Sequence, residues 1–121
     1  MLILIYISLA VNVVVAGFWG IALGFNLFPQ QARVYGLDSP GLRILGSVYL
    51  AIASLSVFAL FSPPHLITII TVLFPLQILY KVLTLKLVGD SRHPVVIANG
   101  MIAVLLAVTW YFAVGKSFSN L

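Results

Sequence analysis

The sequence has no cysteine and very few charged residues. Cysteine is absent from all 121 positions, which excludes disulfides, thiol redox chemistry and thiolate metal ligation. Charged residues make up 7% of the chain, whereas they make up about a quarter of a typical soluble domain. Only two residues are acidic, so the spans lack the carboxylates that many catalytic sites and proton relays use. Water-soluble folds are therefore excluded.

Hydrophobic residues make up 63% of the chain. The mean hydropathy is +1.22. The apolar residues form four runs, each about as long as the 20 residues that cross a bilayer. The sequence predicts an all-α membrane protein, a four-transmembrane-helix antiparallel bundle with short loops, in a single integral membrane domain over residues 1–121. The predicted helices cover about 2–28, 40–61, 66–88 and 94–114.

Proline, glycine and polar residues mark the connections between these runs. The first connection runs from Pro29 to Ser39, and Asp38 or Ser39 is expected to cap the second helix ahead of Pro40. Inside the third helix, Pro75 cannot donate to the Thr71 carbonyl. We therefore expect a bend there unless a neighbour or water satisfies that carbonyl. The first run lacks a basic leader and a cleavage site, so we expect it to remain as a span.

Basic residues set the predicted orientation. With four spans, both termini lie on one side and the first and third connections lie on the other. The basic residues near those two connections are Arg33, Arg43, Lys81, Lys86 and Arg92, against Lys116 on the opposite side. Both termini are therefore predicted to be non-cytoplasmic, in a prokaryotic inner membrane or an organelle membrane. The modest net charge of +4 fits membrane edges and anionic headgroups, not nucleic acid.

Polar residues inside the spans are the best functional signal, because they are costly in hydrocarbon and tend to turn inward. On the third helix, helical spacing puts Gln77, Tyr80, Lys81 and Thr84 on one face. Arg43 and Asn99 are predicted at a similar depth, in the cytoplasmic half. The predicted ligand-binding residues are Arg43, Gln77, Tyr80, Lys81 and Asn99.

Such a cluster suits an anionic headgroup, a carboxylate or a quinone-like carbonyl. The same residues have structural alternatives. Lys81 can snorkel to the headgroups, Arg43 can set topology or pair with Asp38, and Asn99 can bridge helices. Asn12 and Gln77 lie near mid-membrane, where an interhelical hydrogen bond would explain both.

Two further patterns are weaker. His65 and His93 are possible axial ligands, but the predicted topology puts them on opposite membrane faces, where each is an interfacial loop histidine. No metal site is therefore predicted. Gly20 and Gly24 form a GxxxG pair, which allows close helix packing either inside the bundle or at a subunit interface.

The stretch Gly41–Leu50, the stretch Gln77–Lys81 and Asn99 together resemble the small four-helix DoxX-like and BphX-like membrane proteins. The resemblance covers the second to fourth helices and implies the four-helix fold. It also implies a link to oxidoreductase or quinone-related membrane systems.

Two functions remain open from the sequence. The first is an accessory or structural subunit of a larger membrane complex, or a homo-oligomer, whose partners are membrane lipids and other membrane-protein subunits. The second is a binder, carrier or enzyme for a lipophilic anion or quinone, in which a bound lipid or quinone is the cofactor. Enzymatic activity is left open, and the absence of a carboxylate inside the spans favours a non-catalytic role.

Overall fold

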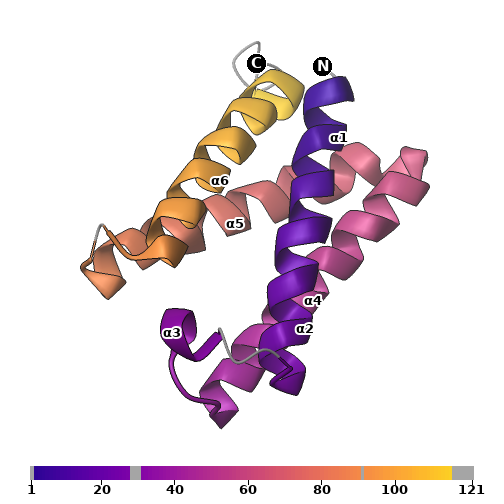
Figure 1. Cartoon of the computed structure of the whole chain (residues 1–121). Coiled ribbons are helices and arrows are strands. Elements are labelled where there is room, and N and C mark those ends of the chain that lie inside the picture. The colour runs from indigo at the N-terminus through magenta and orange to yellow at the C-terminus, as the bar shows by residue number, and fades with distance from the viewer. Residues whose placement is uncertain (1, 28–30, 91, 116–121) are drawn as a thin grey trace. The chain divides into compact units, whose positions relative to one another are not determined.

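The computed structural model describes residues 2–27, 31–90 and 92–115, with the backbone alone at residues 31 and 32. Every regular element in these ranges is helical and none is a strand (Figure 1). Within the described part of the chain, the prediction of an all-α fold is confirmed.

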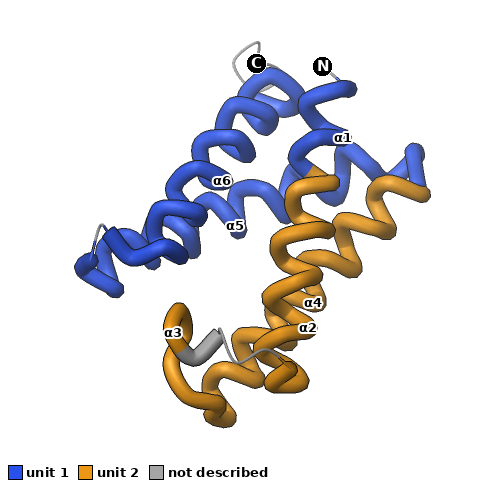
Figure 2. The backbone as a smooth tube through the Cα atoms, in the orientation of Figure 1, with its two compact units in different colours: residues 1–8, 62–121 blue, residues 9–61 orange. Residues whose placement is uncertain are grey.

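The chain divides into two compact units, which Figure 2 colours separately. Unit 1 comprises residues 1–8 and 62–121, and unit 2 comprises residues 9–61. The boundary falls inside the first helix, so that helix contributes its opening turns to unit 1 and the rest to unit 2. The single membrane domain expected over residues 1–121 stays a prediction.

In the part of the chain that the structure describes, four helical stretches are long and apolar enough to cross a membrane. The first consists of α1 (Leu2–Val11), the π-helical turn η1 (Asn12–Ala16) and α2 (Gly17–Phe25). The second is α4 (Pro40–Phe61). The third consists of the 3₁₀ turn η2 (Pro63–His65) and α5 (Leu66–Val88). The fourth consists of α6 (Pro94–Trp110) and the π-helical turn η3 (Tyr111–Gly115).

These bounds differ from the expected ones mainly around the first connection. The first helix ends at Phe25, because Asn26 adopts a left-handed conformation with φ of 52°. A short helix, α3 (Gln31–Tyr35), occupies part of the region expected to be a loop. The predicted end of the first helix at residue 28, the start of the first connection at Pro29 and the basic residue Lys116 lie outside the described residues.

Side chains cap two of the long helices. The Leu42 amide donates to the Ser39 hydroxyl at 3.2 Å, so Ser39 is the cap expected ahead of α4. His93 Nδ1 accepts from the Val95 amide at 3.2 Å and caps α6. These caps satisfy amides that the first helical turn leaves without a backbone partner.

In unit 2, α2 and α4 pack at backbone contact. A Cβ added to Gly46 would lie 2.6 Å from the Gly24 nitrogen and 3.1 Å from the Gly20 oxygen. Gly20 faces Leu50, and Gly17 faces Ala53. Residue numbers fall on one helix as they rise on the other, so the two helices run antiparallel. The Gly20 and Gly24 pair therefore packs against α4 within unit 2.

In unit 1, α5 and α6 pack together and are also antiparallel. Lys81 contacts Asn99, and ten residues earlier on α5 Thr71 contacts Trp110, which lies later on α6. Residue numbers therefore rise in opposite directions along the two helices. α5 continues through Pro75. The Thr71 carbonyl, which loses its usual donor to that proline, accepts from the Trp110 indole nitrogen at 3.2 Å. A neighbouring side chain thus satisfies the group that the sequence analysis identified.

Candidate functional site

Lys81 is a buried cation on α5. Its relative exposure is 4%, and its Nζ donates to the Asn99 side-chain oxygen on α6 at 3.1 Å. The same Nζ lies 4.8 Å from the centre of the Tyr80 ring, within range of a cation–π contact. Asn99 is itself 6% exposed. Lys81 therefore does not snorkel to a free surface, and its ammonium is held inside the fold by an amide and a ring.

Among the residues of unit 1 that the structure describes, no carboxylate forms an ion pair with this ammonium. The only acidic residues in the sequence are Asp38 and Asp90, and Asp38 belongs to unit 2. Asp90 accepts instead from the Arg92 amide at 3.0 Å. Among the described residues of unit 1, no acidic group lies within 4.0 Å of Lys81. An ammonium carries three N–H donors, so the site can still bond an anionic or carbonyl oxygen.

Gln77 and Tyr80 lie on the same helix as Lys81. Gln77 is 1% exposed and sits one turn before Lys81, where side chains share a face. The Tyr80 carbonyl accepts from the Thr84 hydroxyl at 2.8 Å, within the predicted polar face of this helix. Four of the five predicted site residues thus belong to unit 1, and the structure joins Lys81, Asn99 and the Tyr80 ring.

Arg43 belongs to unit 2 and has partners of its own. Its side chain is 51% exposed and forms an ion pair with Asp38 at 3.0 Å. A second guanidinium nitrogen donates to the Gly24 carbonyl at 3.3 Å. The alternative in which Asp38 neutralises Arg43 is therefore what the structure shows. Participation of Arg43 in one site with Lys81 stays a prediction.

The two histidines occupy turns at helix starts. His65 closes the turn η2, and His93 caps α6. Within residues 2–27, 31–90 and 92–115, no group of three or more histidine, cysteine or acidic side chains could hold a metal ion.

Several polar contacts were not foreseen from the sequence. In unit 1, the Ser8 and Thr109 hydroxyls are 2.7 Å apart and both are buried. In unit 2, the Tyr35 and Tyr49 hydroxyls are 3.0 Å apart. The signal for the first pair was present, because a lone hydroxyl in an apolar helix needs a partner. The second pair depends on the short helix α3, which the sequence analysis treated as a loop.

Aromatic rings also join α2 to α3. The Trp19 ring meets the edge of Phe18 at 5.2 Å and of Tyr35 at 5.0 Å between ring centres. Trp19 thus packs on side chains of unit 2. The expected hydrogen bond between Asn12 and Gln77 stays a prediction, because these two buried residues belong to different units.

Comparison of this chain with protein-family models, with curated protein sequences and with solved structures gave no match. The resemblance to DoxX-like and BphX-like proteins therefore stays a prediction.

Proposed function

We propose that this chain is a multi-pass integral membrane protein that acts as a non-catalytic subunit, within a larger membrane complex or as a homo-oligomer. Its four long apolar helices are the basis for membrane insertion. In the most apolar part of each, only 28% to 33% of the residues are buried. Large apolar side chains such as Ile3, Leu79 and Met101 are exposed, and lipid or partner helices would cover them.

The observation that carries the subunit proposal is that polar side chains inside the spans form hydrogen bonds between helices. Lys81 bonds Asn99, Ser8 bonds Thr109, and Trp110 bonds the Thr71 carbonyl. Each of these contacts joins different helices, and in membranes such bonds hold helices together. The polar groups thus serve cohesion, which fits a structural role.

The proposed orientation places both termini on the non-cytoplasmic side, in a prokaryotic inner membrane or an organelle membrane. Its basis is the grouping of Arg33, Arg43, Lys86 and Arg92 near the first and third connections. We also propose that the four spans pack as an antiparallel bundle. The antiparallel pairs α2 with α4 and α5 with α6 support this proposal.

Native mass spectrometry of the protein, extracted gently from its own membrane, tests the subunit proposal. We expect the chain to leave the membrane with a fixed set of other subunits or as a defined homo-oligomer. Photo-cross-linkers at the exposed positions Leu79 and Met101 should then capture those partners, whereas one at the buried position Phe74 should not. A monomer that carries only lipid, with no cross-linked protein, would contradict the proposal.

A second candidate is a binder for a lipophilic anion or quinone, and the observation that favours it is the buried ammonium of Lys81, which pairs with no acidic group among the described residues. The test is equilibrium binding of a long-chain fatty acid and of a short-tailed benzoquinone to the purified chain. Lys81→Met should weaken binding, whereas Lys86→Met, at an exposed position in the last turn of α5, should not. Equal affinities for both variants and the parent would remove Lys81 from any such site.

A further inference from the structure

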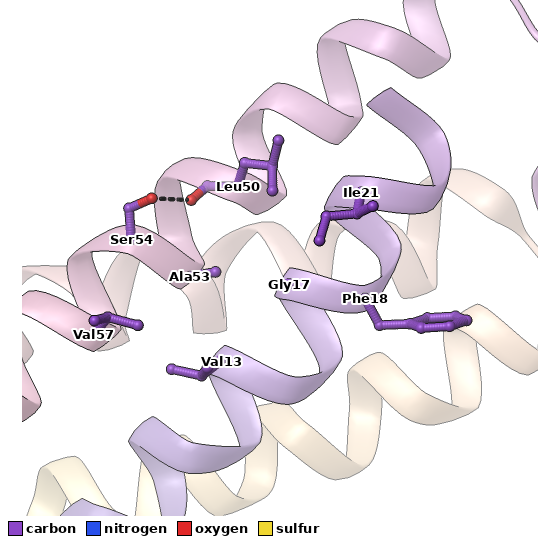
Figure 3. Close-up of a pocket in the computed structure, with 8 residues that line it drawn as sticks. All are labelled: Val13, Gly17, Phe18, Ile21, Leu50, Ala53, Ser54 and Val57. Atoms are coloured by element: carbon purple, nitrogen blue, oxygen red, sulfur yellow. Dashed lines mark hydrogen bonds between the residues drawn. The ribbon is translucent and has the colours of Figure 1, made fainter. Parts of the chain in front are cut away.

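Unit 2 contains an apolar groove between the first helical stretch and α4 (Figure 3). Its volume is about 600 Å³. Val13 and Ile21 line one side, and Leu50 and Val57 line the other. Between them lie Gly17 and Ala53, and a Cβ on Gly17 would make an ordinary contact with that of Ala53 at 3.9 Å. Small residues thus lie between the two helices, while the larger side chains around them form the walls.

The face of α4 that lines the groove from Leu50 to Val57 continues along the helix to Arg43. Residues 43, 47, 50, 54 and 57 are spaced by four and three in turn, which puts them on one face of a helix. Arg43 lies in the first turns of α4, where the helix would meet the headgroups. At about 1.5 Å per residue, Leu50 lies about 10 Å and Ser54 about 16 Å from Arg43 along the axis. Half of a hydrocarbon core is about 15 Å thick, so one acyl chain spans this distance.

The polar end of this face carries a positive charge on Arg43 and a negative charge on Asp38, which can pair with the two opposite charges of a zwitterionic headgroup. A guanidinium has five N–H donors. In Arg43, Nε and one N–H of Nη2 bond Asp38, and one N–H of Nη1 bonds the Gly24 carbonyl, which leaves two donors. Asp38 is bonded to Arg43 alone among the described residues, so its carboxylate has lone pairs to spare. A phosphate can therefore bond Arg43 while an adjacent ammonium bonds Asp38.

We infer that this groove is a phospholipid site, with one acyl chain between Ile21 and Leu50, the phosphate on Arg43 and a primary ammonium of the headgroup on Asp38. The inference rests on the proposed insertion into a membrane. A phospholipid matches the site better than a further helix does, since a lipid brings its charges at one end and an apolar chain behind them. An apolar helix would leave the two spare donors of Arg43 unused.

The test is titration of the delipidated, purified full chain with dioleoyl lipids bearing ethanolamine, glycerol or choline headgroups, followed by native mass spectrometry. We expect one tightly retained lipid per chain, with phosphatidylethanolamine bound best. Arg43→Gln should weaken that binding roughly tenfold, because charge-assisted hydrogen bonds are lost. Arg33→Gln removes the same charge from α3, which contributes no side chain to the groove, and should leave binding unchanged.

Two further variants separate the headgroup from the chain. Asp38→Asn should abolish the preference for ethanolamine over glycerol headgroups. Ser54→Phe places a ring in the groove from an exposed position and should weaken the binding of every phospholipid, whereas Ala51→Phe, exposed and outside the groove, should not. Helix content by circular dichroism checks that each variant remains folded.

Unchanged affinity in both Arg43→Gln and Ser54→Phe would overturn the phospholipid site. Conversion of a dimer to a monomer by Ser54→Phe would also overturn it, because a second copy would then occupy the groove. Extraction with alkaline carbonate distinguishes these failures from failure of the proposed function. A protein that stays in the membrane pellet but binds no lipid here refutes only the groove assignment, whereas release into the supernatant refutes membrane insertion itself.

Discussion

Lys81 and Asn99 are the residues on which the chemistry of unit 1 depends. An ammonium in a low-dielectric interior is costly unless it is paired and hydrogen-bonded. Asn99 supplies one acceptor at 3.1 Å, and the Tyr80 ring adds its negative face at 4.8 Å. The sequence predicted that Lys81 and Asn99 share a depth, because rise per residue alone sets depth. It left open whether Lys81 turns inward, since that choice depends on what the facing helix offers.

Removal of Asn99 alone should lower the free energy of unfolding more than removal of both Lys81 and Asn99. Asn99→Leu leaves the Lys81 ammonium buried without its acceptor, so we expect a loss of about 1–3 kcal/mol in the free energy of unfolding. Lys81→Met combined with Asn99→Leu should recover most of that loss, because no unsatisfied polar group remains. Titration of the parent, Asn99→Leu, Lys81→Met and the double variant with sodium dodecyl sulfate in mixed micelles gives the required free energies. Strictly additive losses would show that the two side chains are not coupled.

At the scale of the element, the starts of α4 and α6 could be predicted from the sequence, whereas the end of the first helix and the π-helical turns could not. Ser39, Pro40 and Pro94 carry local signals, and α4 and α6 begin where these residues predict. The π-helical turns η1 and η3 carry no such signal. A π turn accommodates an extra residue, which depends on packing against neighbouring elements and not on composition. The short helix α3 was missed because polar residues and nearby prolines are also typical of loops.

The contact between α2 and α4 gives a prediction about glycine. Gly46→Ala would put a methyl group 2.6 Å from a backbone nitrogen and 2.9 Å from the Cα of Gly24. Backbone cannot move aside as a flexible side chain can, so the helices must separate, at a cost of about 1–3 kcal/mol. Thermal unfolding in detergent should show a clear decrease in the midpoint temperature.

The matched control is Gly100→Ala in α6. Its added methyl group would lie 3.9 Å from the nearest atom, a Leu85 methyl carbon, which is an ordinary contact. Alanine favours a helix over glycine by up to about 1 kcal/mol, so this variant should be neutral or slightly more stable. A similar loss from both substitutions would mean that the close approach at Gly46 is not what determines stability.

The continuity of α5 gives a second prediction at this scale. Trp110→Phe keeps an aromatic ring but removes the donor to the Thr71 carbonyl, and we expect a loss of about 1 kcal/mol. In a chain that already carries Pro75→Ala, the alanine amide can donate to Thr71 in the usual helical way. The same tryptophan substitution should then cost less.

Unfolding free energies of the parent, both single variants and the double variant measure this coupling. An equal cost of Trp110→Phe with and without Pro75 would show that the indole contributes by packing and not by satisfying the carbonyl.

For the whole molecule, the distribution of apolar residues predicts four spans, and the distribution of basic residues is the basis of the proposed orientation. Composition and run length predicted the four long helices, since bilayer thickness fixes the length that each needs. Which helix faces pair was harder to foresee, because both the interior and the lipid-facing surface of a membrane protein are apolar. Gly46 illustrates this, since its role depends on the backbone of a helix some 20 residues away.

The most direct test of the proposed membrane topology uses the absence of cysteine, which makes any introduced thiol unique. Leu37→Cys lies between the first two spans, and Ser62→Cys lies between the second and third. A membrane-impermeant maleimide added to intact cells should label position 62 at once and position 37 only after the membrane is permeabilised. Labelling of both positions from the same side without permeabilisation would contradict the four-span account.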